Sequence, residues 1–300
     1  MSNEQEAWHQ YWQQGNQQSC VASSSEQALV EQLWLDWQAS LPSQAKVLDL
    51  ATGNGAVISS LLKASYSVDN QYIGVDYTSA DNTPVSNKTN VSFVGGVDLA
   101  KLPQDTQSMD AVTSQFGFEY AAIDKTISQV VRVLKNTGQL QFIVHHSEGE
   151  IVRANRLRYR EIEFLLAPEA PLEKAKHLVD QKISIDELEA AGQAYLRLHQ
   201  GNLTASISGQ VFETINQVVL AVNSGRYQQA KALNGSLLGK LSAEYTRLNQ
   251  LIKVAKDERQ IIEIVDKFKA LGVSCRYQSI LTNDSLTFAW LIDGVKNDKP

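Results

Sequence analysis

Two carboxylates, each placed just after a predicted strand, are the side chains of this chain best suited to hold a small polar ligand. Asp76 ends the apolar run Tyr72–Val75, and Asp98 lies between Val97 and Leu99 after a second apolar run. A carboxylate is an acceptor with two oxygens, so Asp76 can accept from both hydroxyls of a ribose. Asp98, set among apolar residues, can bond the amino group of an adenine ring. Either acid alone is more often a solvated residue that ends a strand, so the prediction of a ligand site depends on the ordered set of strands around them.

A glycine turn directly precedes these acids and offers the backbone amides that such a ligand needs. The run V-L-D-L-A-T-G-N-G from Val47 to Gly55 is a buried strand that leads straight into this turn. Gly53 and Gly55 permit positive φ and a close approach of the backbone to a ligand. The segment Ala56–Leu62 reads as the following helix, whose first amides point toward the same place.

The elements that position these groups alternate between strands and helices. Asp76 lies about 20 residues beyond the last glycine, as expected for the second strand of a βαβ unit. An amphipathic helix is predicted over Asp124–Leu134. The predicted strands are Val47–Leu50, Tyr72–Val75, Val91–Val94, Met109–Thr113 and Gly138–His145. This order predicts a parallel sheet with ligand-binding residues at the carboxyl ends of its strands.

The ordered set of motifs resembles the class I S-adenosylmethionine-dependent methyltransferases over about residues 30–148. The family's glycine loop, D-x-[AG]-x-G-x-G, is matched by the seven residues from Asp49 to Gly55. Further likeness lies in Asp76, in V-D-L-A-K-L-P from Val97 and in M-D-A-V-T-S-Q-F-G-F-E-Y from Met109. The dinucleotide fingerprint G-x-G-x-x-G is not met, because Ala51 and Ile58 replace two of its glycines, and a nicotinamide enzyme is disfavoured.

The resemblance implies S-adenosylmethionine as cofactor, S-adenosylhomocysteine as product, and no metal. The implied cofactor-binding residues are Asp49, Ala51, Gly53, Asn54, Gly55, Asp76, Tyr77, Val97, Asp98, Leu99, Gln115 and Phe116. The methyl group on a sulfonium is already activated, so no catalytic base is obligatory. Candidates for a base, by location alone, are Glu119, Tyr120, His145 and His146, and Glu119 is favoured because it follows the fourth strand. The two adjacent histidines face opposite ways in a strand, so at most one is expected to enter the site.

The C-terminal residues are expected to complete the sheet. A helix over Asp257–Leu271 precedes two alternating strands, one over Val273–Tyr277 and one over Leu286–Ile292. The expected fold is therefore α/β, with a Rossmann-like, seven-stranded, mostly parallel sheet and an antiparallel final strand. Residues 1–146 and 257–300 would form this cofactor-binding domain.

Residues 147–256 are expected to be a helical insertion between the fifth and sixth strands. Three helices are predicted, over Ile151–Leu166, Leu203–Val222 and Leu237–Ile252. The insertion could be a lid, a substrate pocket or a contact in a homodimer. Arg153, Arg156, Arg158 and Arg160 at its start could bind an anionic acceptor, although an ion-paired or solvated helix face is favoured.

Residues 1–22 are expected to form a cap helix. Trp8, Tyr11 and Trp12 cluster at helical spacing, and Ser23 and Glu26 form a capping-box signal for the next helix. Such aromatic clusters usually belong to a core. In the family that this chain resembles, a helix before the sheet commonly covers the cofactor, so Tyr11 and Trp12 are candidates for closing the site.

Composition sets limits on the class of protein. The net charge of -6 disfavours a global basic surface for nucleic acid, and 43% hydrophobic residues suffice for a packed core. The two cysteines, Cys20 and Cys275, and the polar start of the chain indicate a cytoplasmic protein without membrane spans. Three functions stay open: a small-molecule methyltransferase, a cofactor-binding regulatory or assembly protein without transfer activity, and an RNA-modifying methyltransferase. The first is favoured.

Overall fold

The computed structural model describes residues 3–13, 21, 23–64, 69–78, 87–198 and 207–298. The chain forms two compact units. The first consists of Met1–Arg153 and Gln250–Pro300, and the second is Ala154–Asn249. The division falls within two helices, α5 (Glu150–Leu165) and α9 (Tyr227–Val254).

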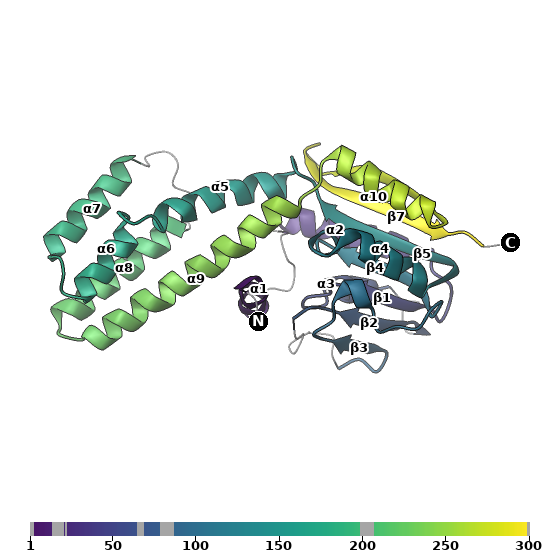
Figure 1. The fold of residues 1–300 in the computed structure, drawn as a ribbon, viewed down its shortest axis with the longest axis horizontal. Helices are drawn as coiled ribbons and strands as arrows, with labels where there is room; N and C mark the ends of the chain where they lie inside the picture. The colour runs from purple at the N-terminus through teal and green to yellow at the C-terminus, as the bar shows by residue number, and fades with distance from the viewer. Residues whose placement is uncertain are drawn as a thin grey trace. The chain divides into compact units, whose positions relative to one another are not determined.

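The first unit is built on a seven-stranded sheet in the order β3-β2-β1-β4-β5-β7-β6 (Figure 1). Strands β1 to β5 pair in parallel, whereas β7 pairs antiparallel with both β5 and β6. This is the predicted Rossmann-like sheet with its antiparallel final strand. The strands are β1 (Lys46–Leu50), β2 (Gln71–Val75), β3 (Val91–Val94), β4 (Met109–Gln115), β5 (Leu134–His145), β6 (Val273–Leu281) and β7 (Thr287–Lys296).

Helices cover both faces of this sheet because its strands are apolar on both sides. Leu48 of β1 joins a cluster with α4 (Ile123–Val133) and α10 (Glu258–Ala270). Its neighbour Val47 points the other way, toward α2 (Ser24–Gln38) and α3 (Ala56–Leu61). The fully buried Phe268 of α10 contributes on the order of 1.5–3 kcal/mol by leaving water.

The termini of the helices follow local sequence signals. The predicted capping box is present at α2, where Ser23 Oγ accepts from the Glu26 amide at 3.2 Å and Glu26 Oε2 accepts from the Ser23 amide at 3.2 Å. A second capping box, of Asp257 and Gln260, starts α10. Both boxes satisfy amides that have no partner within the first helical turn.

The strand bounds differ from the predicted ones at the start of β5 and at the ends of β6 and β7, which reach Leu281 and Lys296. Strand β5 starts at Leu134, not at Gly138, because Leu134 pairs with Met109 before the register shifts. The shift absorbs a short irregular segment that includes Thr137, whose φ is +60°. Hydrophobic alternation could not show this pairing, since the segment after Leu134 is polar.

The second unit is helical. Besides parts of α5 and α9 it contains α6 (Pro171–Val179), α7 (Ile185–Leu198) and α8 (Ile207–Asn223). Helices α6 and α7 were not predicted separately, and Leu203 lies outside the described residues. The buried Glu161 of α5 caps α8 by accepting from the amide and the hydroxyl of Ser208, at 3.0 and 2.6 Å.

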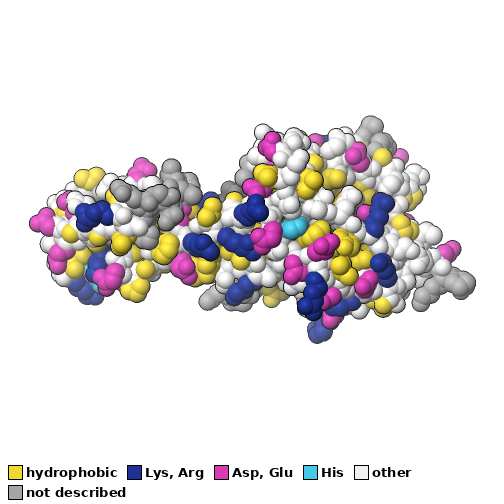
Figure 2. All heavy atoms as spheres, turned by 90° about the horizontal axis from the view of Figure 1, so that it is seen from above, with side chains coloured by type: hydrophobic (Ala, Val, Ile, Leu, Met, Phe, Trp, Pro, Cys, Tyr) yellow, Lys and Arg dark blue, Asp and Glu magenta, His cyan; other side chains and the backbone are white. Residues whose placement is uncertain are grey.

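Charged side chains at the start of the insertion are engaged in ion pairs. Arg153 lies 3.2 Å from Glu150, and Arg158 lies 3.0 Å from Glu244, which also binds Arg247. On the face shown in Figure 2, Lys and Arg side chains are interspersed with Asp and Glu. These observations agree with the ion-paired interpretation of the arginine cluster.

Two further sequence expectations concern the cysteines and membrane spans. Cys275 is buried, and burial raises the pKa of its thiol to about 12, so the thiol is neutral. Cys20 lies outside the described residues. Among the helices of the described part of the chain, none combines the length and hydropathy of a membrane span.

Candidate active site

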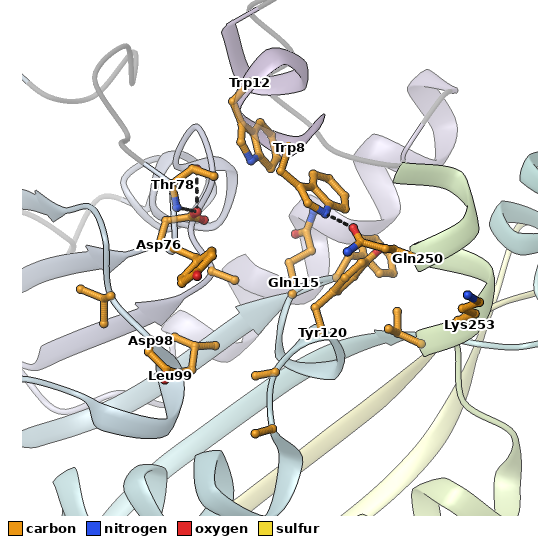
Figure 3. Close-up of a pocket in the computed structure, with 18 residues that line it drawn as sticks. Trp8, Trp12, Asp76, Thr78, Asp98, Leu99, Gln115, Tyr120, Gln250 and Lys253 are labelled. Carbon is orange, nitrogen blue, oxygen red and sulfur yellow. Dashed lines mark hydrogen bonds between the residues drawn. The ribbon is translucent and has the colours of Figure 1, made fainter. Parts of the chain in front are cut away.

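A cavity of about 590 Å³ lies at the carboxyl ends of β1, β2 and β4 (Figure 3). Its position is the one at which open α/β sheets bind ligands, and its size suits a small molecule. Its wall consists of Trp8, Trp12, Ala51, Asp76, Tyr77, Thr78, Val97, Asp98, Leu99, Gln115, Phe116, Gly117, Tyr120, Ala121, Ala122, Gln250, Lys253 and Val254.

The glycine loop is held open by left-handed backbone conformations. Ala51 and Gly53 both have a φ of +50°, and Gly55, with a φ of +77°, is the N-cap of α3. The loop is tied to the end of β2, because the Thr52 amide donates to the Val75 carbonyl at 3.0 Å. The backbone near Gly53 is thereby brought beside the first acid of the site.

Asp49 lies beneath this loop and does not line the cavity. Its Oδ2 accepts from Thr52 Oγ1 at 2.6 Å, and its Oδ1 accepts from Thr113 Oγ1 at 2.9 Å. Burial raises the pKa of this carboxyl to about 7, and the nearby charge of Asp76 adds to the shift. The role that the structure shows for Asp49 is to fasten the loop to β4.

Asp76 is buried and forms part of the cavity wall. Its Oδ2 accepts from the Gly53 amide at 2.8 Å, while its Oδ1 accepts from the amide and the hydroxyl of Thr78, each at 2.8 Å. Burial raises the pKa of this carboxyl, and the hydrogen bonds oppose that rise. The Thr78 hydroxyl is a donor that can rotate away, so a hydroxyl of a ligand can take its place.

Beyond Asp76 the wall becomes apolar around a second acid. Val97 and Leu99 are buried, whereas Asp98 is exposed at the edge of the cavity. Asp98 Oδ1 accepts from the Ala100 amide at 2.9 Å, which orients the carboxylate. Apolar faces beside an acceptor suit a flat heterocycle that carries an amino group.

Two residues at the end of β4, Gln115 and Phe116, line the middle of the cavity. Gln115 is held by Trp34, whose Nε1 donates to its Oε1 at 2.7 Å. Phe116 has a φ of +54°, and its amide donates to the Ile143 carbonyl at 2.8 Å. These bonds fix both residues where the strand leaves the sheet.

Helix α1 (Asn3–Gln13) forms the wall above the glycine loop. Trp8 Nε1 donates to Gln250 Oε1 at 2.7 Å, and Asn54 Nδ2 donates to the Trp12 carbonyl at 3.2 Å. The Trp12 ring lies directly on Gly53, since a Cβ on that glycine would come within 2.5 Å of the ring. Tyr11 packs edge-on against Trp12 at 5.1 Å and is not part of the cavity wall.

Comparison with protein families assigns the centre of the first unit. Residues 47–138 match the family model described as "Methyltransferase domain". This segment is a class I S-adenosylmethionine-dependent methyltransferase domain. Its cofactor is S-adenosylmethionine. The residues present fit this cofactor: a buried carboxylate with a replaceable donor, Asp76, lies in the same wall as the apolar Val97 and Leu99 beside Asp98.

The comparison with curated proteins found no match. Among solved structures, similar chains include a SAM-dependent methyltransferase from Aquifex aeolicus, at 19% identity over 43% of this chain and 77% of that chain, TM-score 0.35. Another is the complex of the Haloferax volcanii Trm112 methyltransferase activator with a methyltransferase, at 16% identity over 92% and 95%, TM-score 0.46. The assignment of the methyltransferase domain rests on the family match over residues 47–138, not on these likenesses.

Of the four candidates for a catalytic base, Tyr120 alone lines the cavity. Glu119 is buried behind it, where its Oε1 accepts from the His145 amide at 2.9 Å and lies 2.6 Å from His145 Nδ1. The His145 ring packs against Phe116 at 4.5 Å, so it supports the wall from behind. His146 stacks on Trp290 at 4.2 Å, and burial lowers the pKa of its imidazole.

Several of the residues predicted to bind the cofactor of the methyltransferase lie in the wall. Those that do not are Asp49, Gly53, Asn54, Gly55 and Tyr11. For Gly53 the reason is visible in the structure, because Trp12 covers it. Among the described residues, no group of three or more potential metal ligands gathers.

The wall also contains residues that the sequence analysis did not assign to the site. They are Trp8, Thr78, Gly117, Ala121, Ala122, Gln250, Lys253 and Val254. A signal existed for Trp8, which precedes Trp12 by four residues and so shares its helical face. No signal existed for the end of α9, because nothing local shows which distant segment a helix will meet.

Proposed function

We propose that this protein transfers the methyl group of S-adenosylmethionine to a small molecule bound in the same cavity. The observation that carries the proposal is that one cavity wall has two acids at one end and aromatic and amide side chains away from them. Asp76 and Asp98 lie at one end, and Trp8, Tyr120 and Gln250 lie away from them, where helices α1 and α9 contribute (Figure 3). A cavity with room beyond its cofactor-binding acids suits a cofactor and an acceptor together.

The proposed roles of the residues follow from their contacts. Asp76 would accept from the ribose, with the Thr78 hydroxyl giving way, and Val97, Asp98 and Leu99 would hold the adenine. Bound S-adenosylmethionine supplies a methyl group that is already activated on a sulfonium. The chain therefore has to place the acceptor in line with that methyl group and exclude water.

The aromatic side chains of the cavity wall help to exclude water. Trp8 stacks on Trp12 with ring centroids 6.1 Å apart and meets Tyr120 edge-on at 5.3 Å. These rings cover the middle of the cavity with large apolar surfaces and leave little room for bulk water. The Tyr120 ring is proposed to position the acceptor, because Tyr120 is the one base candidate that the cavity reaches.

Calorimetric titration with S-adenosylmethionine and S-adenosylhomocysteine, with NADH as control, tests the cofactor part of the proposal. Micromolar binding of the first two and none of NADH is expected. Asp76→Asn should weaken binding about tenfold to a hundredfold, since a lost bond to a charged acceptor costs about 1–3 kcal/mol. Asp110→Asn is the matched control, because Asp110 pairs with Lys135 at the start of β4, away from the cavity.

Formation of S-adenosylhomocysteine tests transfer itself. Incubation of the protein with S-adenosylmethionine and small-molecule fractions of a cell extract should produce it, and Asp76→Asn should reduce the rate. Tight cofactor binding without turnover in any fraction would favour a regulatory or assembly role instead. Turnover that needs RNA and falls steeply with salt would favour the nucleic-acid substrate.

A further inference from the structure

We propose that the methyl acceptor is a small aromatic carboxylate whose anionic group binds Lys253 and whose ring lies against Trp8 and Tyr120. This inference rests on the proposed methyl transfer and adds the class of its substrate. It comes from the charges, donors and rings of the cavity wall, where Trp8, Gln250 and Lys253 lie outside the methyltransferase domain of residues 47–138 and Tyr120 lies within it.

The charges of the wall are separated along the cavity. Of the residues that form the wall, Asp76 and Asp98 are the acids and Lys253 is the base. Figure 3 shows Lys253 on the opposite side of the view from Asp76 and Asp98, with Trp8, Gln115 and Tyr120 between them. Within the part of the chain that the structure describes, no carboxylate forms an ion pair with Lys253. Lys253 is exposed at the cavity wall, so an anionic group of a bound ligand can pair with it.

A hydrogen-bond donor near Lys253, the amide nitrogen of Gln250, favours a carboxylate as the anionic group of the acceptor. Trp8 Nε1 can only donate, so the amide oxygen of Gln250 must be the atom that faces it, at 2.7 Å. The Gln250 amide nitrogen is left as a donor, and Gln250 and Lys253 share one face of α9 because they are three residues apart. One ammonium and one amide match the two oxygens and single charge of a carboxylate. A phosphate dianion is usually met by more positive charge, often from arginine.

The rings between the two ends favour an aromatic body for the acceptor. Trp8 and Tyr120 meet edge to face at 5.3 Å, and both line the cavity. Flat rings pack well against such surfaces in offset or edge-on arrangements. With its carboxylate on Lys253, the ring would lie between α9 and the cofactor-binding acids, which places a ring substituent toward the methyl group.

The test uses the full chain saturated with S-adenosylhomocysteine and calorimetric titration with matched acids and amides. The pairs are benzoate and benzamide, para-hydroxybenzoate and its amide, and indoleacetate and its amide. Each pair shares a ring and differs in the charge that Lys253 would bind. At least one acid is expected to bind about tenfold more tightly than its amide, the size of one accessible charge pair at close range.

Substitutions of Lys253 test whether the preference for the acid over its amide depends on the charge of this side chain. Lys253→Met keeps the length of the side chain without its charge and should abolish the preference, whereas Lys253→Arg should retain most of it. Lys253→Gln serves as a second neutral variant, and unchanged affinity for S-adenosylhomocysteine shows that each variant is folded. Lys88→Met removes an exposed lysine just before β3, at the other end of the strands, and should change nothing.

The outcomes separate this inference from the function on which it rests. Failure of the wild-type protein to bind S-adenosylhomocysteine overturns the proposed function and the inference with it. Binding of S-adenosylhomocysteine with no acid preference in any pair overturns the inference alone. A preference that persists in Lys253→Met also overturns it, because the anionic group would then bind elsewhere.

Discussion

The two ends of the cavity are built in different ways. At the proposed cofactor end, Asp76, Asp98 and Gln115 lie at or just after the ends of strands, and all three lie within the methyltransferase domain of residues 47–138. At the other end, Trp8 comes from α1 and Lys253 from α9, both outside that domain. The difference teaches that the sheet determines the proposed cofactor site, whereas the proposed acceptor site also takes residues from segments that the sheet does not constrain.

The two ends also differ in how firmly they are held. Asp76 accepts from two backbone amides, of Gly53 and Thr78, which are anchored in the sheet region. Helix α1 is attached by side-chain contacts such as those of Trp8 with Gln250 and of Asn54 with the Trp12 carbonyl. Changes at the cofactor end should therefore affect stability and cofactor binding, and changes at the acceptor end should affect mainly the closure of α1.

The largest expected effect is on the pH dependence of stability at the cofactor end. Because the pKa of Asp49 is raised to about 7 from 3.8, the folded protein keeps a proton that the unfolded chain loses. The free energy of unfolding should therefore fall as pH rises from about 4 to about 7, by on the order of 4 kcal/mol from this group. Urea unfolding at several pH values measures this fall.

Asp49→Asn is the variant that isolates this group. An asparagine keeps two polar atoms for the hydroxyls of Thr52 and Thr113, which can rotate to suit it, and does not titrate. Its stability should fall much less over the same pH range. Equal slopes in the two proteins would show that Asp49 does not hold the proton.

An intermediate effect is expected from Gly53→Ala in the loop. The new methyl group would collide with Trp12 at 2.5 Å, and an alanine at a φ of +50° costs about 1–2 kcal/mol. Affinity for S-adenosylhomocysteine should fall at least about tenfold. Gly272→Ala is the control, since it has a φ of +83° and nothing within 4 Å, so it carries the backbone strain without the collision. Equal affinity of the Gly53→Ala and Gly272→Ala variants for S-adenosylhomocysteine would show that the cofactor does not bind beside Gly53.

The smallest effect is expected at the acceptor end from Gln250→Leu. This change removes the acceptor for Trp8 Nε1 and should loosen α1 by about 1 kcal/mol. Amide hydrogen exchange in α1 should rise about fivefold while exchange in β1 stays as it was. Unchanged exchange in α1 would mean that other contacts hold this helix.

The sheet could be predicted because its signals are local and repeated. Each strand is a short apolar run, and the D-x-[AG]-x-G-x-G loop marks the first of them, so Asp76 and Asp98 could be placed at their ends. The segments that contact the long helices could not be predicted. Apolar residues at helical spacing indicate that one face of a helix is buried, but they do not indicate which segment covers that face. Gln250 and Lys253 illustrate this, since they line one cavity with Trp8 and Tyr120, which are more than a hundred residues away in the sequence. The use of the insertion as a dimer contact stays a prediction.

The position of Trp12 on Gly53 has a consequence for the timing of the proposed methyl transfer. A ring that lies on the glycine loop has to leave before a cofactor can reach the backbone there, and it has to leave again before the product can depart. Opening and closing of such a helix commonly takes microseconds to milliseconds and often limits the rate of an enzyme. The cofactor should accordingly enter before the acceptor, and departure of S-adenosylhomocysteine should be the slow step of the cycle.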